Sequence, residues 1–221
     1  FELQGVGVNL EIPNVLALSG NVTFFDGDTS GFKGDISLDL MAVGLEMDAS
    51  MVVGKRTRED GSTYKFFYLY LDIQLPAGIP LGCSGAGLYG LAGLFAYNME
   101  PGKDEGQEWY EGDDGAVGWY KESPEGVTGT DKWTDAEGSM AIGGGITLGT
   151  IADNGYLVSA KALLVIVLPG PIIMIEGKAN FLKPRSELSD EPILKALAVL
   201  DNRAGFFLLN IEAQYKYEQE E

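Results

Sequence analysis

Histidine is absent from this chain of 221 residues, and cysteine occurs once, as Cys83. Histidine is the commonest general base and the commonest ligand of transition metals, so its absence excludes most of the familiar catalytic and metal sites. The single cysteine has no partner for an internal disulfide, and its apolar, glycine-rich surroundings predict a small buried side chain. We therefore expect a protein that is not an enzyme and that holds no cofactor.

Positive charge is also scarce: 15 lysine and arginine residues against 33 acidic ones give a formal net charge of −18. This charge opposes binding to nucleic acid and to anionic membrane surfaces, so we expect neither as a partner. Residues 73–99 carry no charge, but two prolines and six glycines favour a glycine-rich sheet over a membrane helix there. Tyr215 and Tyr217 are too few for the aromatic girdles of strands that cross a membrane.

Hydrophobicity repeats with a period of two along most of the chain. Successive side chains of a strand point to opposite faces of a sheet, so this period predicts an all-β fold of long, mainly antiparallel strands in a curved or partly closed sheet. The length fits one domain over residues 1–221 or one module of a longer chain, and the start at Phe1 favours a fragment or a mature product. Clear alternations are Val6, Val8, Leu10 and Ile12; Phe67, Leu69, Leu71 and Ile73; and Phe207, Leu209 and Ile211.

Two places depart from simple one-sided alternation. The apolar phase slips by one residue near Met41 and Ala42, which predicts a β-bulge within one long strand. Residues 162–175 carry no charge, and a Pro-Gly-Pro sequence divides them into two arms. Both faces of these arms are apolar, so we expect them to be central in the sheet and covered on both sides.

One segment has helical rather than strand spacing. Ser189 is a capping residue, two acids follow it, and the apolar residues from Ile193 to Leu200 recur at intervals of three to four. This pattern predicts one short helix in the C-terminal half of the chain.

Residues 100–138 form an acidic insert. Twelve acids and three lysines give it a net charge of −9, half of the total. It also contains all three tryptophans of the chain, Trp109, Trp119 and Trp133. Aromatic side chains supply apolar area with which a loop can dock on a sheet. Two interpretations stay open, a solvated flap pinned by its aromatic side chains and a binding lid formed by the three tryptophans.

Asp26, Asp28 and Ser30 stand at alternate positions before a glycine, as in the first half of a calcium-binding loop. The acidic residue that closes such a loop is missing, because Ser37 occupies its place. An ordinary turn between two strands explains the same residues. Ca²⁺ is thus the one metal ion that the sequence indicates, and a turn without metal is the alternative.

Several glycine-rich and apolar blocks carry a family resemblance. They are Ile79-Pro80-Leu81-Gly82, the run from Gly87 to Phe95 and, after the insert, Leu168-Pro169-Gly170-Pro171. Over residues 76–182 the chain resembles a domain of unknown function that is found in very large bacterial β-rich proteins. The resemblance implies a module within a longer protein, and it implies no catalytic residues.

These observations favour a structural or scaffold module without chemistry of its own, which assembles with further copies or with neighbouring β-domains. Strand addition at an open sheet edge is one route, and the apolar residues Val6, Val8, Leu10 and Ile12 are the expected donated strand. The alternative is a groove or cavity that binds lipid or another hydrophobic ligand. For location we favour the extracellular space or the cell surface.

Overall fold

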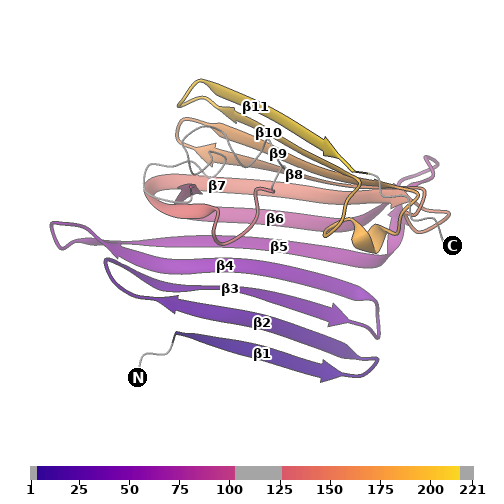
Figure 1. Cartoon of the computed structure of the whole chain (residues 1–221), viewed down its shortest axis with the longest axis horizontal. Helices are drawn as coiled ribbons and strands as arrows, with labels where there is room; N and C mark the ends of the chain where they lie inside the picture. The colour runs from indigo at the N-terminus through magenta and orange to yellow at the C-terminus, as the bar shows by residue number, and fades with distance from the viewer. Residues whose placement is uncertain (1–3, 103–125, 215–221) are drawn as a thin grey trace.

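A computed structural model describes residues 4–102 and 126–214. Within them, 11 strands form one antiparallel sheet in chain order, which does not close, so that β1 and β11 are its edges (Figure 1). The all-β prediction is confirmed. The strands are β1 (Gly5–Ile12), β2 (Leu16–Phe25), β3 (Thr29–Leu40), β4 (Leu45–Thr57), β5 (Thr63–Pro80), β6 (Ala86–Pro101), β7 (Trp133–Thr150), β8 (Val158–Leu168), β9 (Ile172–Phe181), β10 (Leu194–Asp201) and β11 (Phe206–Ala213).

The predicted short helix in the C-terminal half is wrong, because that segment forms β10. This strand pairs with β9 on one side and with β11 on the other along its whole length. The strand is apolar on both faces apart from Lys195 and Asp201, and pairing on both sides outweighs the local helical spacing. The one helical element of the described residues is a 3-10 turn, Arg185–Glu187.

The predicted bulge near Met41 and Ala42 is also wrong, because the chain reverses there. β3 ends at Leu40 and β4 begins at Leu45. The Gly44 N–H donates to the Leu40 carbonyl at 2.7 Å, and Gly44 has a φ of 65°, a left-handed conformation that favours glycine. The slip in apolar phase therefore marks a tight turn between two strands.

Cys83 is exposed, whereas the sequence predicted a buried side chain. It lies in the turn between β5 and β6. Gly82 and Gly85 on either side of it have φ values of 64° and 76°. The glycines near Cys83 thus serve a turn rather than close packing inside the sheet.

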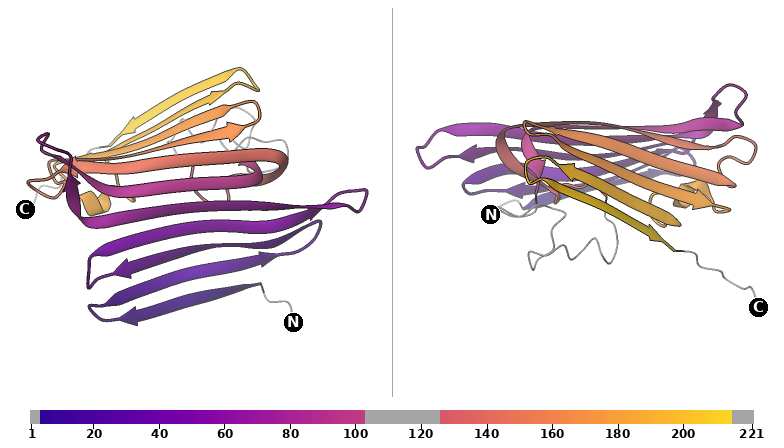
Figure 2. Two further views of the ribbon diagram at one scale, coloured as in Figure 1. Left: turned by 180° about the vertical axis from the view of Figure 1, so that it is seen from behind. Right: turned by 90° about the horizontal axis from the view of Figure 1, so that it is seen from above.

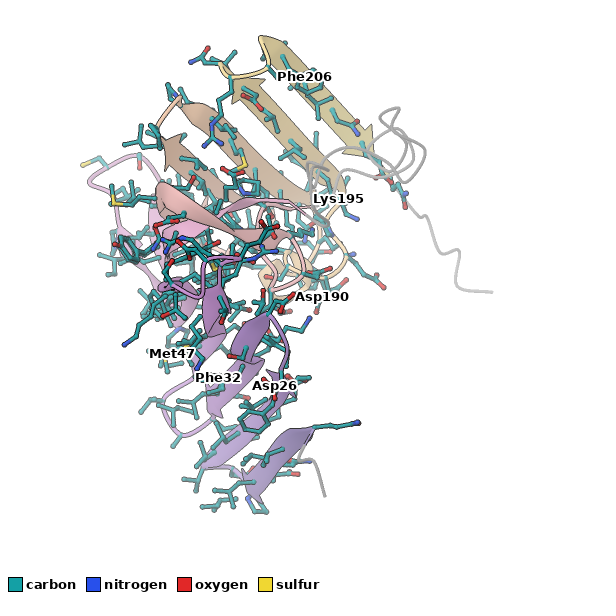
Figure 3. The ribbon with its side chains drawn as sticks, turned by 90° about the vertical axis from the view of Figure 1, so that its left-hand side faces the viewer. Asp26, Phe32, Met47, Asp190, Lys195 and Phe206 are labelled. Atoms are coloured by element: carbon teal, nitrogen blue, oxygen red, sulfur yellow. The ribbon has the colours of Figure 1, made fainter. Side chains whose placement is uncertain are left out.

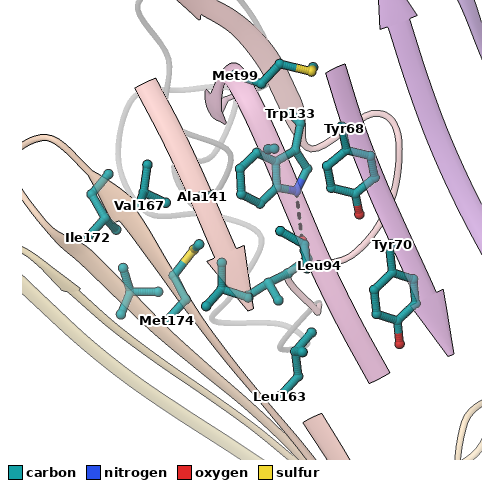
Figure 4. Close-up of a cluster of buried hydrophobic side chains, with 14 of the residues drawn as sticks. Tyr68, Tyr70, Leu94, Met99, Trp133, Ala141, Leu163, Val167, Ile172 and Met174 are labelled. Atoms are coloured by element: carbon teal, nitrogen blue, oxygen red, sulfur yellow. Dashed lines mark hydrogen bonds between the residues drawn. The ribbon is translucent and has the colours of Figure 1, made fainter. Parts of the chain in front are cut away.

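The sheet is curved (Figure 2), and its side chains extend from both faces (Figure 3). The buried core lies on one face, which we call the inner face. Residues 126–133 pack on this face above β5 to β9, and Trp133 and Val127 are buried with the strand residues beneath them (Figure 4). The buried cluster contains Val52, Phe66, Tyr68, Tyr70, Leu94, Ala96, Met99, Val127, Trp133, Ala141, Leu163, Val165, Val167, Ile172, Met174, Leu197, Val199 and Leu208.

The opposite face, which we call the outer face, is open. In the uncharged arms, Leu163 and Met174 point inward and are 2% and 0% exposed, whereas Leu164 and Ile175 point outward and are 43% and 49% exposed. The prediction that these arms are covered on both sides is therefore wrong. They are apolar on both faces, but the fold buries only the inner one.

Candidate functional site

The described end of the insert is attached to the inner face by backbone hydrogen bonds. The Val127 N–H donates to Oε2 of Glu176 at 2.8 Å, and the Gly129 N–H donates to the Tyr68 hydroxyl at 3.3 Å. Tyr68 is fully buried, and its burial raises the pKa of the phenol above the usual range. These bonds fix the segment before β7 over the core.

Trp133 anchors the same segment. Its indole N–H donates to the Val127 carbonyl at 3.0 Å, and its ring centroid lies 5.2 Å from that of Tyr68 (Figure 4). Since Trp133 is only 6% exposed, it acts as a core residue at the start of β7. Trp109 and Trp119, the other two tryptophans of the expected lid, lie outside the described residues.

A second attachment joins β4 and β5 to the beginning of β7. Nη1 of Arg56 lies 2.9 Å from Oδ2 of Asp135, and the Tyr64 hydroxyl donates to the same oxygen at 2.5 Å. Burial, together with this hydrogen bond, raises the pKa of Tyr64 to about 12. The hydrogen bond to Asp135 also raises the pKa of Arg56. Both donors therefore stay protonated beside the carboxylate.

This arrangement predicts a loss of stability at alkaline pH. The pKa of Tyr64 is about 12 in the folded chain and about 10 in an unfolded one, so between these values the unfolded state releases the proton first. The contribution is fully present below pH 10 and is lost as the pH rises toward 12. Urea unfolding at pH 9 and pH 11 measures the loss, which we expect to be smaller in Tyr64→Phe. An equal loss in the variant would contradict this assignment.

A polar network joins β5, β7 and β8 on the inner face. Asp72 and Lys161 form an ion pair, with side chains 6% and 12% exposed. The Gln74 amide donates to Oδ1 of Asp72 at 2.8 Å and to Oγ1 of Thr147 at 3.1 Å. Because the charges are paired and hydrogen-bonded, the network is suited to holding the strands in register rather than to chemistry.

Three lysines stand side by side across β8, β9 and β10: Lys161, Lys178 and Lys195. Like charges directly opposite each other destabilise a sheet, so each needs compensation. Lys178 donates to the Ser189 carbonyl at 2.8 Å and lies 3.9 Å from Glu176. Burial lowers the pKa of Lys178. The periodicity of the sequence gave no sign of this row, which depends on the register of three strands.

Two cavities lie in the described part of the chain; the first has a mainly polar lining, and the lining of the second is polar and apolar in about equal parts. One, of about 400 Å³, lies between β10, β11 and the 3-10 turn, and the other, of about 460 Å³, lies over β1 to β4. Sites for hydrophobic ligands are lined mostly by apolar side chains. The first cavity is lined by Leu182, Lys183, Glu187, Asp190, Glu191, Pro192, Ile193, Lys195, Glu212 and Gln214. The second is lined by Val8, Asn9, Ser19, Gly20, Asn21, Asp35, Ile36, Ser37, Asp48, Ala49 and Ser50.

The residues of the candidate calcium loop form the connection between β2 and β3. Oδ1 of Asp26 accepts the Gly27 N–H at 3.0 Å, Asp28 precedes β3, and Ser30 is already part of that strand. Within residues 4–102 and 126–214, no three acidic or cysteine side chains are grouped closely enough to hold a metal ion. The local geometry is that of a turn.

The expected donated strand is the edge strand β1. It pairs with β2 in continuous register, without a bulge, and all its residues are exposed. Bulges, lysines and prolines commonly protect sheet edges, and β1 contains none of the three. Its outward side chains, Val6, Val8, Leu10 and Ile12, are 46%, 52%, 47% and 44% exposed.

The outer face is apolar across the whole sheet. The register aligns three complete rows of side chains from β1 to β11, and no row contains a polar or charged residue. The central row is Val8, Gly20, Ile36, Ala49, Leu71, Gly93, Gly144, Leu164, Ile175, Ala198 and Leu209. One flanking row is Val6, Val22, Gly34, Met51, Leu69, Phe95, Ile142, Ile166, Ile173, Leu200 and Phe207. The other is Leu10, Leu18, Leu38, Met47, Ile73, Leu91, Ile146, Ala162, Gly177, Ala196 and Ile211.

These rows form a large apolar patch. Strand spacings of about 4.8 Å and steps of about 6.8 Å along each strand give an area of roughly 1,000 Å². The largest apolar patch on a typical soluble monomer measures about 300–600 Å². The outer face is therefore the strongest candidate for a functional surface in the described part of the chain.

Comparison with known proteins identifies the family. A model described as a family of unknown function (DUF6603) matches residues 1–213. The chain belongs to this family. The DUF6603 match contains every strand from β1 to β11. It therefore extends beyond residues 76–182, over which the sequence resembles a domain of unknown function. No curated protein and no solved structure matches the chain. No helix among the described residues is long and apolar enough to cross a membrane.

Proposed function

We propose that the chain is a non-enzymatic assembly module that docks its outer face on another apolar β-surface. The observation that carries this proposal is the set of three rows without a polar side chain. Burial of apolar surface contributes about 25 cal/mol of favourable free energy for each Å² removed from water. Docking of such a large patch therefore has a strong driving force. The open edges β1 and β11 offer a second route, strand addition, that lengthens the same sheet.

We also propose in what kind of protein, and where in relation to the cell, the module acts. We infer that it belongs to a very large β-rich protein of bacterial type, at the cell surface or outside the cell. The resemblance of residues 76–182 supports this setting. In such a protein, neighbouring modules supply apolar sheets and strand edges at high local concentration.

Lysine substitutions on the outer face test the proposal. We expect Ile142→Lys combined with Leu164→Lys to lower the assembled fraction at least tenfold, because a docked face would have to bury two charges without partners. Both residues are exposed, at 59% and 43%, so the fold should tolerate the change. Sedimentation velocity measures assembly, and circular dichroism checks the fold.

A matched control separates position from charge. Asn9→Lys combined with Ser37→Lys adds the same charge at exposed positions of the inner face. We expect this control to assemble like the natural chain. Equal assembly of the natural chain, the outer-face variant and the control would contradict the proposal.

A hydrophobic ligand is the alternative occupant of the outer face, since acyl chains also cover apolar surface. Native mass spectrometry of the purified protein distinguishes the two. A monomer that carries one bound lipid, and that loses this lipid in the Ile142→Lys with Leu164→Lys variant, would support ligand binding. Multimers free of lipid would support assembly.

A further inference from the structure

Two glycines form a notch at the centre of the outer face. Gly93 on β6 and Gly144 on β7 are directly opposite each other in the register, in the middle of the central row. A Cβ atom built on either glycine meets no atom within 4 Å. Neither glycine has a positive φ, so the backbone does not require this residue type.

The inner-face glycines of the same strand differ. A Cβ on Gly143 would lie 2.9 Å from Cγ2 of Val165, and one on Gly145 would lie 2.7 Å from the Ala162 carbonyl oxygen. Packing within the chain therefore explains these two glycines, whereas nothing within the described chain explains Gly144 or Gly93. Glycine weakens a strand interior, and it often marks a place where another molecule approaches closely.

Large exposed apolar side chains surround the notch. They lie on β6 and β7 before and after the two glycines, and on β8 beside Gly144. The surface thus combines a central hollow with projecting side chains, as facing sheets do when their side chains interdigitate. The surrounding residues are Leu91, Phe95, Ile142, Ile146 and Leu164, which are 54%, 41%, 59%, 43% and 43% exposed.

We propose that the occupant of the outer face is a second copy of this chain, packed face to face about a two-fold axis near the notch. The inference rests on the assembly function proposed above. A two-fold interface uses the same patch on both partners, and a central notch ringed by projecting side chains is self-complementary when one ring residue of each copy enters the notch of the other. The area of roughly 1,000 Å² per copy exceeds the 800 Å² or so that a stable interface needs.

Charge favours a protein over a lipid surface as the partner. The three rows carry no charge, so no charged side chain of these rows opposes the contact, although the chain as a whole carries a net charge of −18. Anionic lipid headgroups attract polybasic segments and repel this chain. The remaining repulsion between two copies acts at a distance, so we expect higher salt concentrations to tighten the dimer.

Cross-linking at the notch tests the geometry. In a Cys83→Ser background, Gly93→Cys places a thiol where the chain leaves open space. Packed sheets lie about 10 Å apart, so a bis-maleimide of similar span should join two copies in high yield. Edge-to-edge pairing through β1 or β11 would separate the two thiols by roughly 50 Å, counting strand spacings, and would give no such product.

Filling the notch tests its role in affinity. We expect Gly144→Leu to weaken the dimer at least tenfold, with an unchanged circular dichroism spectrum. Gly7→Leu is the matched control, because a Cβ on Gly7 meets only the Gly20 carbonyl oxygen, at 3.9 Å, on the inner face. We expect the control to dimerise like the natural chain.

The outcomes separate this inference from the assembly function. A dimer that cross-links through Gly93→Cys and weakens with Gly144→Leu supports it. A dimer without the cross-link overturns it in favour of edge pairing. A monomer at about 100 µM that floats with neutral phosphatidylcholine vesicles overturns it in favour of lipid. If the chain is a monomer and binds a separately expressed neighbouring module through the outer face, the proposal of a second copy as partner is overturned, but the assembly function stands.

Discussion

Replacing Trp133 with alanine is expected to lower the free energy of unfolding by about 3–5 kcal/mol. The indole is 6% exposed, packs in a tilted arrangement against the Tyr68 ring and donates to the Val127 carbonyl, so the truncation opens a cavity and leaves a buried acceptor unpaired. Because Trp133 begins β7 and fixes the described end of the insert, the segment over the inner face should loosen with it. Urea unfolding followed by tyrosine fluorescence or circular dichroism measures the loss.

Trp133→Phe is the matched control for this prediction. Phenylalanine keeps an aromatic ring against Tyr68 but cannot donate to Val127. We expect it to recover more than half of the lost stability. If alanine cost less than about 1 kcal/mol, Trp133 would be a surface residue of the kind that a lid requires, and its assignment to the core would fail.

Replacing Asp72 with alanine is expected to cost about 3–5 kcal/mol, because it leaves the Lys161 ammonium group without its partner in a site where both side chains are nearly buried. The Gln74 amide loses an acceptor at the same time. Urea unfolding at neutral pH measures the effect. We expect the apolar double variant Asp72→Leu with Lys161→Met to recover most of the stability, since it removes both charges together.

Asp48→Ala is the matched control for the ion pair. Asp48 is the register partner of Asp72 on β4, but it is exposed. Surface substitutions of this kind usually change stability by no more than about 0.5 kcal/mol. Equal costs at the two positions would show that Asp72 and Lys161 form no stabilising pair.

Alternation along each strand was enough to predict the all-β fold, but not which face the fold covers. Phe67, Leu69 and Leu71 form the more apolar side of β5, yet the structure buries the side that carries Tyr68, which is fully buried, and leaves the apolar side on the outer face. The cover over Tyr68 comes from residues 126–133, distant in sequence. Side-chain polarity on a single strand does not encode such a cover.

The apolar rows of the outer face and the row of three lysines can be recognised only when the register between the strands is known. Each row joins residues from different strands, so a shift of one residue in any pairing would break it. The two local errors have a similar origin. The apolar residues from Leu194 to Leu200 fit a helix as well as a strand that is apolar on both faces, and pairing with β9 and β11 selects the strand. The shift of the apolar phase by one residue before Gly44 is compatible with either a bulge or a turn. The pairing of β3 with β4 shows that it is a turn.

The most direct test of the outer face as a docking surface is oxidative footprinting of two methionines. Met140 points from the outer face, Met41 lies in the turn between β3 and β4, and both are 40% exposed in the single chain. Brief oxidation of the natural protein at high concentration, followed by mass spectrometry, gives their relative rates. We predict that Met140 oxidises at least fivefold more slowly than Met41, and that Ile142→Lys with Leu164→Lys makes the two rates equal. Equal rates already in the natural protein would contradict this prediction.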